Sequence, residues 1–285
     1  MKVLVTGGVG FIGTNLIKRL LKEGHEVISI DNYSTGKKEN EQDGCIYISV
    51  DINDLEYMTS KETLFSDIDV IFHMAALARI QPSLLRPQES INANVNGTLN
   101  VLELARKNNT SVIYAGSSSV HHGLYGSPYA WSKHAGEQLC ELYSKVYGLS
   151  TAICRFYNVY GPYQLESGEY STVLGIFERQ QRSKEPLTIT GDGTQRRDFT
   201  HVDDIVDGLY KCIGKDLKAD IFELGRGENF SINEIVDMFG ADKEYIPARK
   251  GEYPVTLCDT SPAKDKLGWV PSRDLKDYIE SVVNG

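Results

Sequence analysis

The chain has 285 residues, a formal net charge of −9 and a hydrophobic content of 41%. This length and content suffice to bury a large core, in one large domain or two modest ones. The acidic balance argues against a general affinity for DNA or RNA, although a local basic pocket could still hold a small anion. We therefore expect a small-molecule ligand and no nucleic-acid partner.

The cysteines and the first residues bear on the compartment. The five cysteines lie far apart, with no C-x-x-C pair and no spacing typical of zinc ligands. They indicate reduced thiols in a cytosolic protein, and we predict no metal site. The stretch MKVLVTGGVGFIG has one lysine and a short apolar run before its glycines, which is neither a secretory signal nor a membrane anchor. We expect a cytoplasmic protein with no membrane partner.

Short β-branched runs alternate with segments of helical period from residue 1 to about 160. The runs predict strands at 2–6, 25–31, 45–51, 69–76, 110–117 and 150–159. They contain few polar interruptions, as expected when both faces of a sheet are covered. Apolar residues at helical spacing predict helices at 13–24, 95–109 and 127–148. Repeated units of this kind predict an α/β fold with a Rossmann-type, doubly wound parallel sheet.

The pattern changes after about Gly161. Loops become longer, short strands are predicted at 186–190 and 220–225, and helices are predicted near 171–184, 202–214 and 231–239. We predict a first domain at 1–160 and a smaller mixed α/β portion at 161–285. Some strands of the second range could return to the first sheet.

A glycine motif, TGGVGFIG, connects the first strand to the first helix. Gly7, Gly10 and Gly13 would let the backbone turn tightly and approach a pyrophosphate at the positive end of the helix. By itself the motif could be a strand-ending turn followed by a capping aspartate. However, the next strand ends in Asp31, about 18 positions after Gly13, where a carboxylate can accept both hydroxyls of an adenosine ribose and repel a 2′-phosphate. This context predicts NAD rather than NADP.

Two further segments fit the same cofactor pocket. Asp51 and Ile52 follow the third strand, where the aspartate could reach the adenine amino group and the isoleucine could cover its face. Residues 74–78 end the fourth strand in mostly small side chains that leave room for the cofactor phosphates. Lys37 and Lys38, just after Asp31, are the one signal against NAD.

The stretch AGSSSVHHGLYGSPYAWSK, residues 115–133, carries the candidate chemistry. Tyr129 and Lys133 stand at i and i+4 near the start of a helix, so both side chains share one face. A nearby ammonium group lowers the pKa of a phenol, which makes the phenol a usable base near neutral pH. A serine hydroxyl from the preceding strand end could bind the same substrate oxygen. The arrangement predicts a proton relay for alcohol and ketone chemistry.

Two other interpretations of this stretch are weaker. A hydrolase triad lacks both a Gly-x-Ser-x-Gly elbow and an acid placed to orient His121 or His122. Adjacent histidines on an extended chain point to opposite sides, so His121 and His122 do not easily face one metal ion.

Together the motifs resemble a known family. The chain is similar to the extended short-chain dehydrogenase/reductases, and within them to the UDP-glucose 4-epimerase-like, NAD-dependent nucleotide-sugar epimerases and dehydratases. The resemblance extends from Lys2 to about Asp277. It rests on TGGVGFIG, HMAALA, INANVNGTLNVLELA, SSS followed by YAWSK, RFYNVYGP, GDGTQRRDFTHVDDIVDG and CDTSPAKDKLGW.

The resemblance implies a mechanism. The first domain would keep NAD bound, and the C-terminal portion would hold a nucleotide-diphosphate sugar, with a UDP-sugar expected from the family. Tyr129 would act as the base on a sugar hydroxyl, Lys133 would lower its pKa and bind the nicotinamide ribose, and Ser117 would polarise the hydroxyl. Hydride from C4 would pass to NAD and return to the other face of a 4-keto sugar.

The resemblance also implies a set of binding residues. The expected cofactor residues are Gly7, Gly10, Phe11, Ile12, Gly13, Asp31, Asn32, Asp51, Ile52, Met74, Ala75, Ala76, Asn94, Tyr129, Lys133 and Tyr157. The expected substrate residues are Arg79, Ser118, Ser119, Asn158, Arg197, Arg249 and Thr256. Among these, Asn158 and the arginines at 197 and 249 would bind the diphosphate, and Thr256 would limit bulk at C2 of the sugar. Structural alternatives are a salt bridge from Arg197 to Asp198 or Asp203, and a turn-capping role for Asn158.

The chain departs from the family between the serines and Tyr129. Only about twelve positions separate Ser117 from Tyr129, and VHHG stands where members often have VYG. The catalytic serine could therefore be Ser117 or Ser118, and His121 or His122 could fill the space of the missing tyrosine.

The same stretch bears on the type of reaction. Family 4,6-dehydratases usually have an acid within the serine motif, whereas this chain has Ser118 and Ser119 there. We predict epimerisation at C4 of UDP-glucose, UDP-galactose or their N-acetyl forms. A dehydratase, a ketosugar reductase and a non-catalytic NAD-binding protein stay open. The resemblance also implies a homodimer formed through helices near 88–108 and 129–148.

Overall fold

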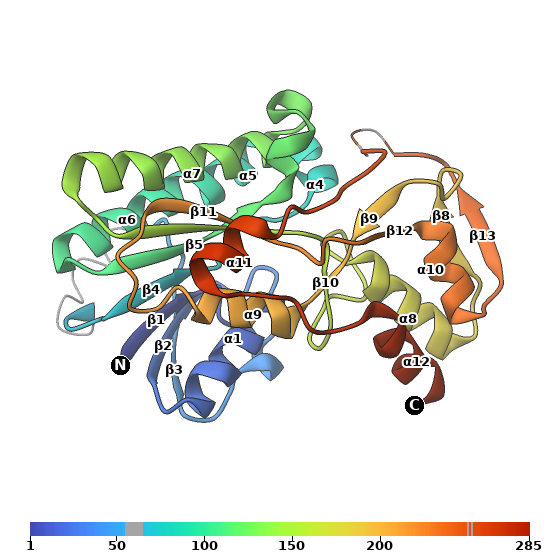
Figure 1. Cartoon of the computed structure of the whole chain (residues 1–285), viewed down its shortest axis with the longest axis horizontal. Coiled ribbons are helices and arrows are strands. Elements are labelled where there is room, and N and C mark those ends of the chain that lie inside the picture. The colour runs from blue at the N-terminus through green and yellow to red at the C-terminus, as the bar shows by residue number, and fades with distance from the viewer. Residues whose placement is uncertain (55–64, 250, 252) are drawn as a thin grey trace.

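The centre of the molecule is a parallel sheet. The computed structural model describes residues 1–54, 65–249, 251 and 253–285, and across these the sheet has seven strands in the order β11-β6-β5-β4-β1-β2-β3 (Figure 1). Every pairing in the sheet is parallel. Its strands are β1 (Lys2–Thr6), β2 (Glu26–Asp31), β3 (Cys45–Ser49), β4 (Val70–His73), β5 (Ser111–Ser117), β6 (Thr151–Phe156) and β11 (Lys218–Leu224). The predicted Rossmann-type sheet is confirmed.

Helices cover both faces of this sheet, and each strand supplies apolar side chains to both. Along β1, Val3 and Val5 join one buried core, whereas Leu4 joins the other. The first core contains α1 (Phe11–Lys22), α9 (Val202–Tyr210) and α11 (Ser261–Leu267). The second core contains α6 (Gly97–Asn108) and α7 (Pro128–Tyr147). Burial on both faces explains why the strands read as continuous apolar runs.

Short helices precede α6 on the second face. They are α4 (Ile80–Leu85) and α5 (Pro87–Ile91), and a π-helical turn at Asn92–Asn96 joins α5 to α6. α7 begins where Ser127 caps it, since the Ser127 hydroxyl accepts the backbone N–H of Ala130 at 3.1 Å. It ends at Gly148 in the left-handed conformation. These helices place Tyr129 in the first turn of α7, near the carboxyl end of β5.

The C-terminal portion has a third core of its own, at the other end of the molecule (Figure 1). Its helices are α8 (Val173–Ser183), α10 (Ile232–Phe239) and α12 (Leu275–Asn284). Its strands form three pairs: β8 (Leu187–Thr190) with β13 (Lys243–Ile246), β9 (Arg196–Asp198) with β12 (Asn229–Ser231), and β7 (Val159–Tyr160) with β10 (Thr200–His201).

The chain crosses between the two parts more than once. The strand β11 comes from the second predicted range but lies at the edge of the seven-stranded sheet, beside β6. α9 and Trp269 also pack into the first core. The division at 160 and 161 stays a prediction.

Three general features complete the fold. All five cysteines, Cys45, Cys140, Cys154, Cys212 and Cys258, are free thiols. No helix in the described ranges has both the length and the apolar character needed to cross a membrane. Nor do three or more His, Cys, Asp or Glu side chains gather as metal ligands anywhere in the described part of the chain.

Candidate functional site

The glycine loop between β1 and α1 packs closely against the end of β4. Gly7 has a φ of +74°, and a Cβ atom there would lie 2.7 Å from the backbone nitrogen of Ala75. A Cβ atom at Gly13 would lie 2.1 Å from the carbonyl oxygen of Gly7. Side chains are therefore excluded at Gly7 and Gly13, and the start of α1 is open to an anionic ligand.

This loop forms one wall of a cavity of about 580 Å³. Most of the predicted cofactor residues line it, namely Gly7, Gly10, Phe11, Ile12, Gly13, Asp31, Asn32, Asp51, Ile52, Met74, Ala75 and Ala76. They come from the carboxyl ends of β1 to β4, where a parallel sheet of this type binds its ligands. Lys37 and Lys38 are not among the described residues that line this cavity.

Asp31 is held rigidly at the end of β2. Its carboxylate accepts the backbone N–H groups of Val9 at 3.1 Å and Tyr33 at 2.8 Å. Burial raises the pKa of Asp31, and these two hydrogen bonds oppose that rise. Each carboxylate oxygen has a second lone pair for a ribose hydroxyl, so the residues present fit an adenine dinucleotide without a 2′-phosphate.

Four predicted cofactor residues do not line this cavity, namely Asn94, Tyr129, Lys133 and Tyr157. Asn94 is buried behind it, and its side chain pairs with both backbone groups of Leu77, at 2.8 and 3.1 Å, and with the Ser132 hydroxyl at 3.0 Å. Asn94 thus fixes a wall residue against α7. Tyr157 lines neither this cavity nor the larger one described below, and Gly225 lies against its ring.

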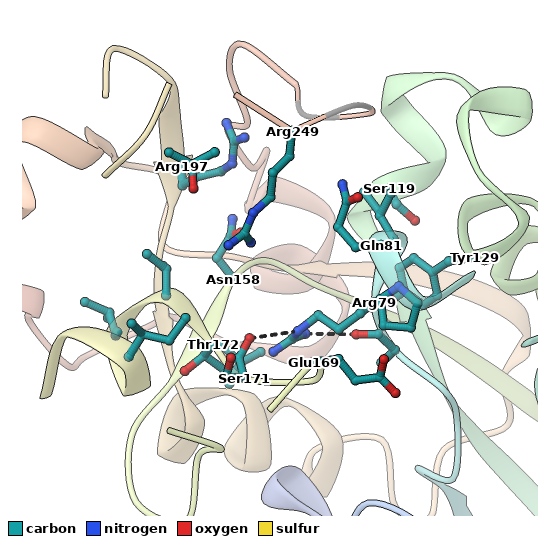
Figure 2. Close-up of a pocket in the computed structure, with 18 of the residues that line it drawn as sticks. Arg79, Gln81, Ser119, Tyr129, Asn158, Glu169, Ser171, Thr172, Arg197 and Arg249 are labelled. Atoms are coloured by element: carbon teal, nitrogen blue, oxygen red, sulfur yellow. Dashed lines mark hydrogen bonds between the residues drawn. The ribbon is translucent and has the colours of Figure 1, made fainter. Parts of the chain in front are cut away.

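A larger cavity, of about 1040 Å³, adjoins the first. Arg79 lines both cavities, as do Ala78, Phe11, Ile12, Glu169 and Thr172, so the two spaces meet there. All predicted substrate residues line the larger one, several of them visible in Figure 2: Arg79, Ser118, Ser119, Asn158, Arg197, Arg249 and Thr256. Ser117 and Tyr129 line it as well.

Tyr129 and Ser117 come together inside the larger cavity. The Tyr129 hydroxyl donates to the Ser117 hydroxyl at 3.2 Å, and the Ser117 hydroxyl lies 2.9 Å from that of Ser119. The backbone N–H of Tyr129 donates to the Ser83 hydroxyl at 3.1 Å, which ties α4 to the start of α7. Between the two serines left open by the sequence, the fold thus brings Ser117 to Tyr129.

A cation that acts on Tyr129 is Arg79, whereas the sequence predicted Lys133 in this role. Burial raises the pKa of Tyr129, while the Ser117 hydrogen bond and the positive charge of Arg79 oppose that rise. The guanidinium group of Arg79 is partly buried, and it donates to the backbone carbonyls of Ser171 at 3.2 Å and Ala78 at 2.9 Å (Figure 2). The sequence predicted Arg79 as a substrate residue, with no sign that its charge acts on Tyr129.

Lys133 is buried one turn further along α7. Its ammonium group lies 4.3 Å from the centroid of the Tyr114 ring. Burial lowers the pKa of Lys133 to about 8, and the nearby charge of Glu137 opposes this. The predicted effect of Lys133 on the pKa of Tyr129, and its predicted contact with the cofactor ribose, stay predictions.

At the other end of the larger cavity, Arg197 and Arg249 lie near Asn158 (Figure 2). The Asn158 side chain donates to the backbone carbonyl of Asp198 at 2.8 Å and to the Thr256 hydroxyl at 3.3 Å. These two contacts join Asn158 to segments far along the chain and do not cap a turn, and Asn158 still lines the cavity.

The acids considered as partners for Arg197 make other contacts. The carboxylate of Asp198 accepts backbone N–H groups from Arg226 at 2.7 Å, Gly227 at 2.9 Å and Cys258 at 3.0 Å. Asp203 forms an ion pair with Arg273 at 3.2 Å, and its backbone N–H donates to Nδ1 of His201 at 3.1 Å.

The two histidines of the short loop have different surroundings. His121 turns away from the larger cavity and contacts Glu223 of β11 at 2.8 Å. His122 lines the cavity and stacks on Tyr253, with ring centroids 4.5 Å apart. Sequence reasoning did not identify Tyr253 or Gln81 as cavity residues. Tyr253 lies between the predicted residues Arg249 and Thr256 but was not itself identified, and the signal at His122 was only its place in a short loop.

Comparison with known proteins supports this geometry. The model of the NAD dependent epimerase/dehydratase family matches residues 3–225. The chain is 33% identical to a putative UDP-glucose 4-epimerase of Methanocaldococcus jannaschii, over 99% of this chain and 97% of that protein. It is 33% identical to a UDP-glucuronate 4-epimerase of Thermodesulfobacterium geofontis, over 99% and 94%.

A solved structure is similar over the whole chain. It is the UDP-glucose 4-epimerase of Thermotoga maritima with UDP-glucose, with a TM-score of 0.93 and 31% identity, and the match covers 100% of this chain and 98% of that one. The chain belongs to the NAD dependent epimerase/dehydratase family. The predicted family is confirmed, and NAD is the cofactor, as the sequence predicts.

Proposed function

We propose that this protein is an NAD-dependent epimerase that inverts C4 of a UDP-hexose. The observation that carries the proposal is the contact between the Tyr129 and Ser117 hydroxyls in a cavity that adjoins the dinucleotide cavity. The relatives named above, which are UDP-sugar 4-epimerases, support the class of substrate.

In the proposed reaction, Tyr129, Ser117 and Arg79 have different roles. NAD, when bound, supplies the acceptor and then the donor of a hydride. Tyr129 takes the proton of the sugar 4-hydroxyl as the C4 hydrogen leaves, and it later returns that proton to the oxygen of the 4-keto sugar. Ser117 donates a hydrogen bond to the same oxygen, and the charge of Arg79 stabilises the Tyr129 phenolate.

The larger cavity must hold the nucleotide while the sugar turns over. Arg197 and Arg249 can bind the diphosphate through charge-assisted hydrogen bonds. Anchoring at the diphosphate leaves the hexose free to rotate about its bonds to phosphorus, so the keto sugar can present its other face. Lys133 binds the nicotinamide ribose in this proposal.

Product analysis tests the reaction. Purified protein is incubated with UDP-glucose, UDP-galactose, UDP-N-acetylglucosamine and UDP-N-acetylgalactosamine, and the products are resolved by NMR. We expect interconversion within at least one C4 pair, without consumption of added NADH. Carbonyl signals of a 4-keto-6-deoxy sugar would indicate a dehydratase, and steady consumption of NADH would indicate a reductase.

A pair of tyrosine variants supplies the control. Tyr129→Phe should lower kcat by at least about a thousandfold, because it removes the base. Tyr125→Phe changes an exposed tyrosine of the same stretch, 90% accessible to solvent, and should leave kcat unchanged. A wild-type protein that retains NAD but converts none of the four sugars would instead be a non-catalytic NAD-binding protein.

We also propose that the protein works as a homodimer in the cytoplasm. Large apolar side chains are exposed along the outer face of α6 and α7, including Leu99, Trp131, Leu142 and Val146. A second copy could cover this face through a two-fold axis. Sedimentation at about twice the mass of one chain would support the dimer, and Leu142→Glu should then yield monomers. The five free thiols support a reducing compartment.

A further inference from the structure

His122 and Tyr253 form a small aromatic wall of the larger cavity. His122 ends the 3₁₀ turn Ser118–His122 that follows β5, and Tyr253 lies in the segment between β13 and α11. Their rings stack with centroids 4.5 Å apart and planes inclined by 27°. The first part of the chain thus meets the C-terminal portion at this wall, and both residues line the cavity that contains Tyr129.

Each ring has a polar atom without a partner. The Nε2 atom of His122 and the hydroxyl oxygen of Tyr253 are buried, and neither has a hydrogen bond within the part of the chain that the structure describes. A buried polar group without a partner is energetically costly. Two such atoms on stacked rings beside a ligand cavity indicate partners supplied by a ligand.

The protonation of both groups indicates the kind of ligand. Burial lowers the pKa of His122, and the charges of His121 and Arg197 lower it further. Burial raises the pKa of Tyr253. Both side chains are therefore neutral near pH 7, and each can donate and accept a hydrogen bond. Two neutral groups of this kind suit a sugar hydroxyl, which also donates and accepts hydrogen bonds. A phosphate group only accepts hydrogen bonds, and the arginines of the cavity are better partners for it.

The position of the wall agrees with this assignment. The turn that carries His122 begins next to Ser117, which contacts Tyr129. Arg197 lies close enough to both rings for its charge to act on each. A ligand that extends from Tyr129 to Arg197 therefore passes this wall between its reacting carbon and its diphosphate.

We propose that His122 and Tyr253 form a subsite for hydroxyl groups of the hexose ring. The subsite rests on the proposed function, because it takes the ligand to be a nucleotide-diphosphate sugar. In it, the two side chains hydrogen-bond the sugar and contribute to the choice of substrate, and they leave the diphosphate to the arginines.

Binding of a nucleotide with and without the sugar tests the subsite. In the Tyr129→Phe holoenzyme, which does not turn over its ligand, the Kd is measured by calorimetry for UDP, UDP-glucose and UDP-N-acetylglucosamine. His122→Phe and Tyr253→Phe are added separately, since each keeps a ring in the stack and removes the polar atom. Each should weaken binding of at least one UDP-sugar about three- to tenfold and change binding of UDP by less than about twofold. Tyr125→Phe, at an exposed tyrosine, should change neither.

Other results would overturn the subsite in distinguishable ways. Equal weakening of UDP and UDP-sugar would place the two side chains on the nucleotide or diphosphate. Unchanged affinity for both ligands in both variants would make the stack purely structural, while leaving the proposed function intact. Failure of the Tyr129→Phe holoenzyme to bind any of the three ligands would overturn the subsite and the proposed function together.

Discussion

The two adjoining cavities are built in different ways. The smaller is lined by short contiguous stretches at the carboxyl ends of neighbouring strands, and its shape at Gly7 and Gly13 depends on the absence of side chains. The larger collects side chains from segments between Phe11 and Thr256, including several arginines and two neutral stacked rings. The fold itself thus makes the cofactor cavity, whereas individual side chains make the chemistry of the substrate cavity.

Among Gly7, Arg79 and Lys133, substitution of Gly7 should have the largest effect, and this effect should be confined to the cofactor cavity. In Gly7→Ala the new Cβ atom would meet the Ala75 backbone 2.7 Å away, in a conformation with a φ of +74° that disfavours side chains. We expect NAD affinity to fall by at least about a hundredfold, because the loop must move away from its place under the pyrophosphate. Affinity for UDP should change by less than about twofold. Calorimetry with each ligand measures both.

Gly24→Ala is the matched control. Gly24 has a similar φ of +80°, but a Cβ atom there would meet nothing within 4 Å. This variant therefore has the same type of backbone strain without the clash. Equal NAD affinities for the two variants would show that the close approach to Ala75 does not shape the cofactor cavity.

Arg79 lies where the cavities meet, so its removal should affect chemistry more than binding. In Arg79→Met the cation that opposes the raised pKa of Tyr129 is lost, and that pKa should rise further. The phenolate fraction near neutral pH then falls, so kcat should drop about tenfold at pH 7, and the alkaline rise of kcat should move to higher pH. The pH profile of kcat measures this.

The charge of Arg79 can be separated from its shape. Arg79→Lys keeps a cation and should restore most of the original profile, although its ammonium lacks the planar fork that reaches Ser171 and Ala78. A raised KM with an unshifted profile in Arg79→Met would instead mean that Arg79 only binds substrate, as the sequence suggested.

The contrast between the cavities also explains what the sequence could predict. The β-branched runs predicted six strands of the sheet, and the glycine motif with Asp31 predicted the cofactor cavity, because local backbone geometry follows from local residue patterns. The place of β11 beside β6 was left open, since a strand pattern does not specify its partner. Asn94 was predicted at the cofactor, but its side chain is engaged by Leu77 and by Ser132 of α7, and these contacts depend on how the π-helical turn Asn92–Asn96 packs against other segments.

Local sequence patterns could not predict contacts between side chains from distant segments of the chain. The pairing of Tyr129 and Lys133 could be predicted because their spacing is helical. The role of Tyr253 could not be predicted, because its stack with His122 joins two segments far apart in the chain. The effect of the Arg79 charge on Tyr129 could not be predicted for the same reason, since it depends on the contact between α4 and α7 at the Ser83 hydroxyl. Tyr157 was expected at the cofactor but lines neither cavity, although it follows directly after β6.

Substitution of Lys133 should have the smallest effect, which is a change in the stability of the folded protein. Burial lowers its pKa in the folded protein to about 8, from an ordinary value of about 10.4 in an unfolded chain. Below pH 8 both states are protonated and the folded state bears the full cost of a buried charge. That cost shrinks as the pH rises from 8 towards 10.4, where the unfolded state also loses its proton. Lys133→Met should therefore raise the Tm by a few degrees at pH 7 and by much less at pH 10.

The surroundings of Lys133 make this prediction specific. Glu137 would not be left without a partner, because Arg155 binds both of its carboxylate oxygens, at 3.0 and 2.7 Å. Lys145→Met, at an exposed lysine of the same helix, should change the Tm by less than about one degree at either pH. A gain that is equal at pH 7 and pH 10 would mean that the methionine side chain merely packs better, and that the buried charge costs nothing. A gain that disappears with rising pH would show that the chain keeps an ammonium group in its core against its own stability, as expected of a residue retained for its chemistry.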